Sequence, residues 1–222
     1  MIRLSVDTSF EHLGLCLTRN GVSLANYYSL CHRRNATIIF EVIDDLLKSA
    51  ELSLAEVDAY VVNCGPGSYT GVRIGMSVAK TFAQVHDKPV IPVNSLELLA
   101  GQIRHLKNDF TVLLNCTRRE IFHSVFRIVD DHPVAQTAIQ LTSLEKFIEI
   151  SGGVPVVHYR VNPERRKHEP LFEQLVLLPL DYPVPDAQLL DRLGAYKLAS
   201  SAFDPDLPVQ PLYIKRDVEK PL

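Results

Sequence analysis

One segment of the chain, Val57 to Ala83, restricts the possible folds more than any other. The run Val57 to Asn63 predicts a buried strand, and the glycines on either side of Pro66 predict a sharp turn into a helix. Small residues recur at every fourth position of that helix, at Gly71, Gly75, Ala79 and Ala83. Such a ridge lets another backbone approach closely, and most other faces of the helix are apolar. The helix must therefore be covered on nearly every side.

Two arrangements would cover this helix. In the first, the chain's own sheet covers one side and a second helix covers another, as in ordinary core packing. In the second, the helix joins an upstream amphipathic helix to form a face that binds a partner. An apolar stripe predicts this upstream helix from Ile38 to Leu47, with Asn35 as a candidate N-cap.

Two similar sets of strands are predicted from the sequence. In the first set, apolar residues alternate with polar ones from Ile2 to Val6 and from Leu13 to Leu17, and Asn20-Gly21 predicts a hairpin into a third strand, Val22 to about Leu30. The second set begins near Phe110. Its predicted strands are Phe110 to Asn115, Ile121 to Val129 and Val134 to Leu141. Asp7 would then correspond to Asn115, and both internal duplication and chance similarity would explain the match.

The C-terminal third gives weaker signals. Thr142 or Ser143 is expected to cap a short helix that reaches Ile150, and Val154 to Tyr159 predicts a strand. Asp186 is expected to cap the last helix. The tail beyond it contains four prolines from Pro205 onward and should run extended over the surface.

Composition limits the class of protein. The 222 residues suit one domain or two small lobes, and 23 Lys and Arg against 26 Asp and Glu argue against coating nucleic acid by bulk positive charge. The four cysteines are widely spaced, which favours buried, reduced thiols over a zinc or redox motif. We expect no signal peptide, no membrane helix and a cytoplasmic location.

Few residues point to chemistry. No H-x-x-x-H, H-E-x-x-H or G-x-S-x-G motif occurs, so no metal site and no catalytic centre are expected. Asp7, Thr8 and Ser9 could hold a phosphate or a magnesium-bound water, or could form an ordinary strand-end turn. The loop around Gly65 and Gly67 could cradle a phosphate or be purely structural. The basic segment 160–168 could meet an RNA backbone or be a solvated loop.

Three motifs resemble the TsaB (YeaZ) family of the bacterial tRNA threonylcarbamoyladenosine machinery. They are Val6-Asp7-Thr8-Ser9 with the strands after it, Asn63 to Gly75, and Pro211-Leu-Tyr213-Ile-Lys-Arg216. The resemblance implies an α/β fold of the actin-like ATPase (ribonuclease H-like) class, with two related lobes and a reduced second lobe. We expect the lobes at residues 1–106 and 107–222, with the last helix and tail packing back on the first.

The resemblance also implies a function. The chain would be a non-catalytic subunit that binds the paralogue TsaD, together with the ATPase TsaE, for threonylcarbamoyl transfer to the adenosine beside the anticodon. It would contact tRNA only through the complex and form a homodimer when alone. The partner face would comprise Ile39, Val42, Ile43, Leu46, Gly71, Val72, Gly75, Met76, Ala79 and Ala83. Gly75→Leu would then block partner binding and leave a folded protein.

No cofactor is expected to bind the chain by itself, although ATP and Mg²⁺ could lie at a shared interface. The residues that would face a nucleotide are Asp7, Thr8, Ser9, Gly65, Gly67, Ser68, Thr70 and Arg73. The chain departs from the family pattern at Asn35, Asn115 and Thr117, which puts nucleotide binding in doubt more than partner binding. A metallopeptidase-like enzyme and an actin-fold ATPase or kinase acting alone remain alternatives.

Overall fold

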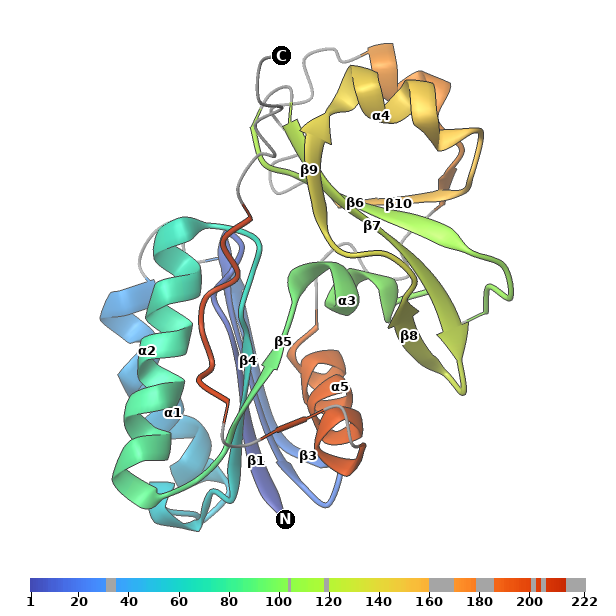
Figure 1. The fold of residues 1–222 in the computed structure, drawn as a ribbon. Coiled ribbons are helices and arrows are strands. Elements are labelled where there is room, and N and C mark those ends of the chain that lie inside the picture. Colours follow the sequence, from blue (N-terminus) through green and yellow to red (C-terminus); the bar gives the residue numbers. More distant parts are fainter. Residues whose placement is uncertain are drawn as a thin grey trace. The chain divides into compact units, whose positions relative to one another are not determined.

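The computed structural model describes residues 1–30, 35–103, 105–117, 120–159, 170–178, 186–200, 203–204 and 207–214 (Figure 1). The chain divides into two compact units. The first contains Met1–Leu98 and Val184–Leu212, and the second contains Leu99–Pro183 and Tyr213–Leu222. The boundary between the units therefore lies after Leu98, and the last helix, Ala187–Ala199, belongs to the first unit. The basic segment 160–168, Cys31 and the end of the third motif, Lys215 and Arg216, lie outside the described residues.

A five-stranded sheet forms the centre of the first unit. Its strands are β1 (Ile2–Asp7), β2 (His12–Arg19), β3 (Val22–Leu30), β4 (Ala59–Asn63) and β5 (Val90–Val93), in the order β3-β2-β1-β4-β5. The first three strands form an antiparallel meander, and β4 and β5 run parallel to β1. Asn20 and Gly21 both have positive φ, at 52° and 82°, so the predicted hairpin turn is confirmed.

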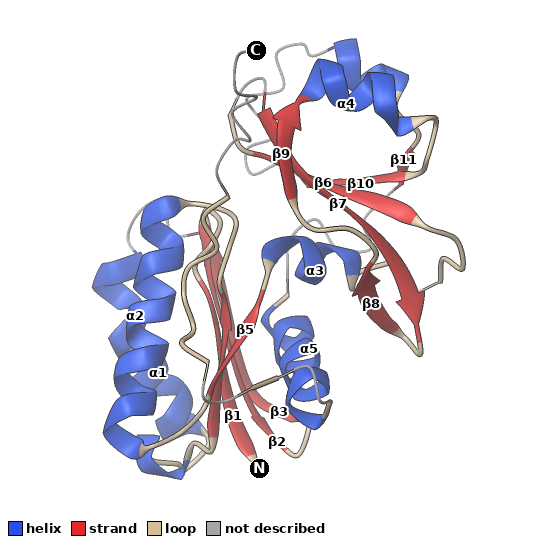
Figure 2. Ribbon diagram, viewed as in Figure 1, coloured by secondary structure: helices blue, strands red, loops and turns tan. Residues whose placement is uncertain are grey.

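Helices cover both faces of this sheet (Figure 2). α1 (Asn35–Ser49) and α2 (Tyr69–His86) share one hydrophobic cluster with β1, β2 and β4, and α5 (Ala187–Ala199) packs on the opposite face. β4 is buried throughout because alternate residues serve the two faces, Tyr60 toward the α1 side and Val61 toward α5. Two shorter elements follow in the chain. The 3₁₀ turn η1 (Leu54–Glu56) belongs to the first unit, and α3 (Ser95–Ala100) begins in the first unit and runs past the boundary after Leu98.

A buried ion pair fastens α5 to the sheet. Asp191 of α5 is 1% exposed and accepts hydrogen bonds from Arg3 Nε at 2.9 Å and Arg3 Nη2 at 2.7 Å. The hydroxyls of Ser5 and Thr18 donate to the same carboxylate, at 3.3 and 3.1 Å. Four donors from β1 and β2 therefore converge on one side chain of α5.

The tail beyond α5 crosses back over the first unit in extended form. Leu212 N donates to Cys64 O at 2.8 Å, and Lys80 Nζ of α2 donates to Val209 O at 3.2 Å. Val209 and Leu212 also pack on the hydrophobic cluster under α2. The predicted extended tail is thus confirmed for the described residues 207–214.

The second unit repeats the topology of the first. Its strands are β6 (Phe110–Asn115), β7 (Glu120–Val129), β8 (His132–Ala135), β9 (Gln140–Ser143), β10 (Val156–Tyr159) and β11 (Leu177–Leu178). The order β11-β10-β6-β7-β8 mirrors the first sheet, with β6 antiparallel to β7 and parallel to β10. Asp7 and Asn115 each end the central strand, so the predicted correspondence between the two sets of strands is confirmed. Among the described residues from β6 to β11, the helical elements between the strands are α4 (Leu144–Ser151), with Ser143 as N-cap, and the 3₁₀ helix η3 (Pro170–Gln174).

Two predictions about local structure are wrong. The single strand expected from Val134 to Leu141 is two strands, β8 and β9, both paired with β7. The ladder is interrupted because the Thr137 hydroxyl accepts a hydrogen bond from Val125 N at 3.0 Å. Burial of the thiols holds for Cys16 and Cys64, whereas Cys116 is exposed.

Among the described residues, no helix combines the length and apolarity needed to cross a bilayer.

Candidate functional site

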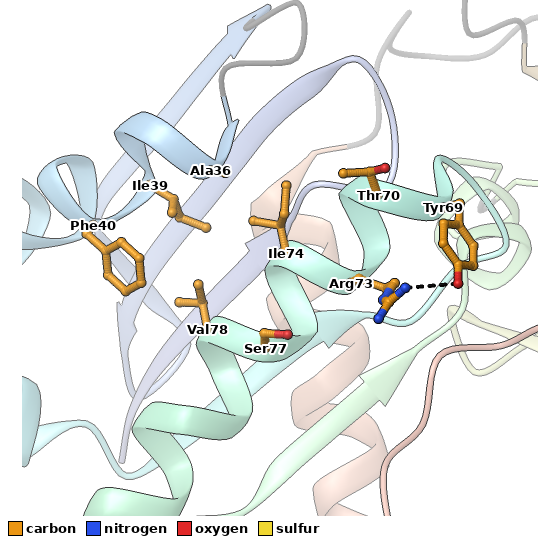
Figure 3. Close-up of a pocket in the computed structure, with 9 residues that line it drawn as sticks. All are labelled: Ala36, Ile39, Phe40, Tyr69, Thr70, Arg73, Ile74, Ser77 and Val78. Carbon is orange, nitrogen blue, oxygen red and sulfur yellow. Dashed lines mark hydrogen bonds between the residues drawn. The ribbon is translucent and has the colours of Figure 1, made fainter.

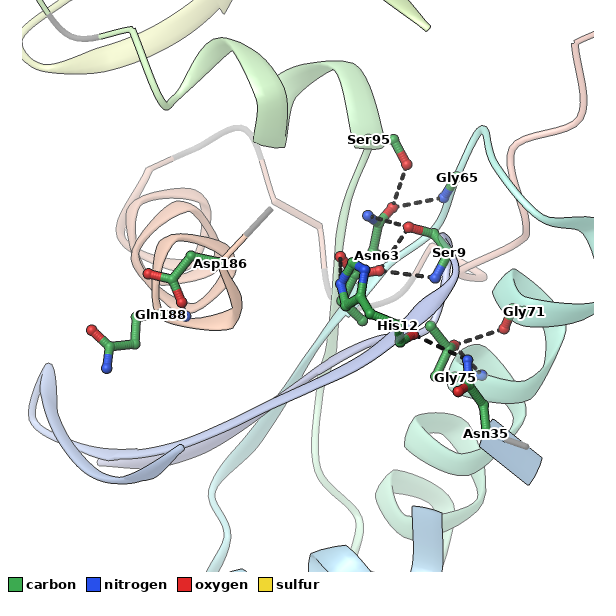
Figure 4. Close-up of polar contacts among 12 residues, drawn as sticks. Ser9, His12, Asn35, Asn63, Gly65, Gly71, Gly75, Ser95, Asp186 and Gln188 are labelled. Atoms are coloured by element: carbon green, nitrogen blue, oxygen red, sulfur yellow. Dashed lines mark hydrogen bonds and ion pairs between the residues drawn. The ribbon is translucent and has the colours of Figure 1, made fainter. Parts of the chain in front are cut away.

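The small-residue ridge of α2 packs against the segment that follows β1 (Figure 4). A Cβ on Gly75 would lie 2.5 Å from Thr8 Oγ1, and one on Gly71 would collide with Thr8 O. The Thr8 hydroxyl donates to Gly71 O at 2.7 Å and accepts from Gly75 N at 3.0 Å. Glycine is therefore needed at both positions for contact within the chain.

This geometry corrects the predicted partner face. The residues of that set that are buried in the first unit's own core are Ile39, Ile43, Leu46, Gly71, Val72, Gly75, Met76, Ala79 and Ala83. Val42 is half-buried against the same core. The apolar stripe of each amphipathic helix is the side that packs on the chain's own sheet. Gly75→Leu would consequently disturb the fold and cannot serve as a clean test of binding.

A polar network joins the end of β1 to β4 and α3. Asp7 Oδ1 accepts from Ser9 N at 2.9 Å and from Ser9 Oγ at 2.6 Å. Asn63 Nδ2 donates to Ser9 Oγ at 2.8 Å, and Asn63 Oδ1 accepts from Gly65 N at 3.0 Å and Ser95 Oγ at 2.9 Å. The network therefore fixes the turn after β1 and the loop that leads into α2.

His12 completes this network on the other side of Asp7. Its Nε2 lies 3.5 Å from Asp7 Oδ2, and both side chains are only 1% exposed. Burial raises the pKa of the Asp7 carboxyl, but His12 and the hydrogen bonds from Ser9 lower it by more, so that this pKa lies below its ordinary value of 3.8. The rings of Phe10 and Tyr28 flank the imidazole. Asn35 Nδ2, at the start of α1, donates to His12 O at 3.1 Å.

The residues expected to face a nucleotide are mostly occupied by these internal contacts. Gly67 lies so close to Ser9 O that a Cβ on Gly67 would collide with this oxygen. Ser68 N donates a hydrogen bond to the same oxygen at 2.7 Å. Ser68 Oγ caps α2 by accepting from Gly71 N at 3.2 Å. The Gly65 and Ser68 amides and the Ser68 hydroxyl are thus engaged within the chain and would have to leave these contacts to bind a phosphate. The described part of the chain contains no group of three or more His, Cys, Asp or Glu side chains placed to hold a metal ion.

An open pocket of about 390 Å³ lies between α1 and α2 (Figure 3). Its lining residues are Ala36, Ile39, Phe40, Tyr69, Thr70, Arg73, Ile74, Ser77 and Val78. We call this surface the α1/α2 groove. Three predicted site residues line it, Ile39 from the partner set and Thr70 and Arg73 from the nucleotide set. The others were missed, although Phe40 and Tyr69 are large apolar side chains placed off the inward stripe.

Exposed apolar surface and one cation distinguish the groove. Phe40 is 56% exposed and Tyr69 is 61% exposed, although both are large aromatic residues. Arg73 is the one charged residue in the lining, and its Nη1 donates to the Tyr69 hydroxyl at 2.9 Å while its guanidinium lies 5.2 Å from the ring centroid. The groove is thus suited to an apolar surface that carries an acidic group.

The two helices that border the groove carry opposite charge. α1 contains Glu41, Asp44 and Asp45 against Lys48, whereas the charged side chains of α2 are Arg73 and Lys80, with no acidic residue. All six side chains are exposed. Lys48 is paired with Asp44 within α1. This surface therefore has an acidic edge and a basic edge.

Comparisons with known proteins identify the family. The family model for TsaD, tRNA N6-adenosine threonylcarbamoyltransferase, matches residues 29–174, which is more than half of the chain. The chain is 32% identical over 127 residues to the tRNA threonylcarbamoyladenosine biosynthesis protein TsaB of Bacillus subtilis, covering 57% of this chain and 56% of that protein. It is 37% identical over 123 residues to TsaB of Haemophilus influenzae, covering 54% and 52%. The matches span about half the length of these curated relatives.

The fold is also found in a solved structure. YeaZ from Pseudomonas aeruginosa superposes with a TM-score of 0.76, covering 96% of this chain and 99% of that one at 22% identity. The match confirms the predicted α/β fold with two related sheets. The family model shows that the chain belongs to the TsaD family, and the curated relatives to which it is similar are TsaB proteins.

Proposed function

We propose that the chain is a non-catalytic subunit in the biosynthesis of threonylcarbamoyladenosine in tRNA, and that it docks a TsaD-like paralogue through the α1/α2 groove. The names of its TsaB relatives support the pathway. The groove supports the mode of action, because exposed aromatic side chains beside an apolar pocket are typical of a surface that another protein covers. This exposed groove is the observation that carries the proposal.

The partner's contribution follows from the shape of the groove. α1 and α2 are long, of 15 and 18 residues, so a helix pair of the partner could lie along them. Burial of both helices would give an interface in the range of about 1,200–2,000 Å² that stable complexes need. An acidic side chain of the partner would neutralise Arg73, whose charge is otherwise held over Tyr69.

In the absence of that partner, the same face is expected to form a homodimer. A two-fold axis across the face would bring the acidic edge of α1 in one copy to the basic edge of α2 in the other. Because each copy offers both charges, the contact would occur twice. Such a dimer would weaken as salt is added, since exposed charges are screened.

The other components follow from the same proposal. A TsaE-like ATPase would join the complex, tRNA would be contacted through TsaD, and the site of action would be the cytoplasm. ATP and Mg²⁺ would be held where the proteins meet, because the side chains after β1 and in the glycine loop are engaged within the chain. The chain would act by positioning the paralogue that carries the chemistry.

Co-purification with a TsaD-type partner from the same cell tests this assignment. Phe40→Ser removes the exposed ring from the groove and should lower retention of the partner at least tenfold. Val85→Ser is the control, because Val85 is 70% exposed on α2, the other helix of the pair, and does not line the groove. Equal retention by both variants would refute the groove as the docking surface.

Reconstitution tests the pathway separately. Threonylcarbamoyladenosine formation on tRNA should require the chain together with the partner, and Phe40→Ser should reduce it. Because the Phe40 ring also contacts Phe82, circular dichroism must show that the variant is folded. Full product formation without the chain would refute the role as a subunit. Product formation by the chain alone would refute the non-catalytic assignment.

A further inference from the structure

The α1/α2 groove has an apolar floor and one polar edge. Figure 3 shows the Phe40 ring of α1 on one side of the groove and Arg73 of α2 on the other. The apolar side chains between them are Ile39, Ile74 and Val78. The polar edge is a row of α2 residues spaced by four positions, Tyr69, Arg73 and Ser77. Residues spaced in this way are neighbours on one face of a helix, so an occupant of the groove would contact the floor and the edge together.

Arg73 carries a charge that no described carboxylate neutralises. Its Nη1 donates to the Tyr69 hydroxyl at 2.9 Å, which is the one hydrogen bond that this guanidinium makes within the described part of the chain. Arg3 and Arg127, by contrast, each donate through Nε and Nη2 to both oxygens of an aspartate. The remaining N–H groups of the exposed Arg73 therefore face water.

A partner that covers the groove would take this water away from Arg73. A charged group that loses its water without gaining a hydrogen-bonding partner opposes association strongly. A neutral carbonyl would accept from the guanidinium but would leave its charge uncompensated. A carboxylate matches the planar fork with two oxygens and supplies the opposite charge. The edge of the groove therefore selects an acidic side chain and repels a basic one.

The dimensions of the groove favour a helix as the occupant. At about 1.5 Å per residue, the row from Tyr69 to Ser77 is roughly 12 Å long, about two helical turns. Apolar residues of an occupying helix at positions i, i+3, i+4 and i+7 would cover the same length. The ridges of α1 and α2 also leave grooves that accept the side chains of a third helix. A helix with one apolar face therefore matches the floor.

The inference rests on the proposed docking of a partner in the groove and names what the docked segment carries. We propose that it is an amphipathic helix with one Asp or Glu at the flank of its apolar face, and that this carboxylate binds the Arg73 fork. Arg73 is then the residue that determines register and specificity. The apolar floor alone would accept the helix at neighbouring positions, whereas a two-pronged contact forms at one position only.

Titration calorimetry of the full chain with the TsaD-type partner tests the proposal. Arg73→Gln removes the charge and keeps a polar side chain, and it should raise the Kd at least tenfold. Arg19→Gln is the matched control, because it makes the same exchange at an exposed position of β2 that does not line the groove. This control should leave the Kd unchanged. Circular dichroism should show the same melting temperature for both variants, since both arginines are exposed.

Charge reversal identifies the acidic residue. Arg73→Glu should bind the unaltered partner more weakly than Arg73→Gln does, because two carboxylates would face each other. Each Asp and Glu on the partner's helices is then replaced in turn by Arg. One of these replacements should restore binding to Arg73→Glu and weaken binding to the wild-type chain. Restoration by none of them would overturn the proposal.

The outcomes separate this inference from the proposed function. Weaker binding by Phe40→Ser together with an unchanged Kd for Arg73→Gln would keep the groove as the docking surface and overturn the carboxylate. An unchanged Kd for both variants would overturn the groove itself and the inference with it. An effect of Arg73→Gln that appears only when Mg-ATP is present would assign a phosphate to Arg73 and would overturn the choice of a partner side chain.

Discussion

The ion pair between Arg3 and Asp191 offers the sharpest quantitative prediction. Asp191→Asn keeps the shape of the side chain but removes its charge, which leaves the Arg3 guanidinium in a site where its side chain is only 7% exposed. Ser5 and Thr18 also lose a charged acceptor. Removing one partner of a buried pair costs about 3–5 kcal/mol because the other charge stays uncompensated.

This cost is large against the stability of a typical domain, about 5–15 kcal/mol. With a dependence on urea of about 2 kcal/mol per molar, the unfolding midpoint should fall by roughly 1.5–2.5 M. Replacing both partners with apolar residues, Arg3→Met with Asp191→Leu, should restore most of the loss, because the desolvation penalty of both charges disappears together.

Urea titrations followed by circular dichroism provide the measurement, and Asp109→Asn is the matched control. Asp109 receives the same two-pronged contact from Arg127, at 2.6 and 2.9 Å, but both side chains are at least 40% exposed. This change should leave the midpoint almost unaltered, because water replaces the lost contact. Equal midpoints for Asp191→Asn and Asp109→Asn would refute the argument that burial sets the strength of the pair.

Three further predictions concern the segment after β1. Gly75→Ala should destabilise the protein by about 1–3 kcal/mol, since the new Cβ would lie 2.5 Å from Thr8 Oγ1, whereas the exposed Ser77→Ala should not lower the melting temperature. Folding lowers the pKa of Asp7, so the ionised carboxylate stabilises the protein above pH 3.8, and this stabilisation is lost as the pH falls through the folded pKa. The difference in unfolding free energy between wild type and Asp7→Asn should therefore be largest near neutral pH and shrink below pH 3.8. Calorimetric titration of the chain alone with Mg-ATP should give no binding heat, and saturable heat that Asp7→Ala abolishes would contradict the occupied geometry described above.

Much of the fold could be predicted from local pattern. The hairpin at Asn20 and Gly21 needs positive φ at both positions, which these residues tolerate, and the structure has it. The cap at Ser143 and the cap at Asp186 likewise lie where short polar side chains precede an apolar run. The division of β8 from β9 was missed, because it depends on a hydrogen bond to Thr137 from the neighbouring strand.

The candidate site was harder to predict. Periodicity locates the side of α2 that is covered, but it does not distinguish the chain's own sheet from a partner. Thr8 decides the question at Gly71 and Gly75, and Thr8 lies more than sixty residues away in the sequence. The groove itself is formed by side chains that the inward stripe excludes, such as Phe40. Apolar residues that lie outside the inward stripe therefore indicate which surface is exposed.

The interrupted first unit has a consequence for how the protein is made. Val184–Leu212, with α5 and the tail, is synthesised only after most of the second unit. Until α5 emerges from the ribosome, the face of the first sheet that contains Val61 and Ile91 lacks its cover, although both residues are fully buried in the finished protein. The second unit can fold first, because its strands are contiguous in sequence. A chain that stops before α5 would therefore leave an aggregation-prone nascent product and not a smaller functional domain.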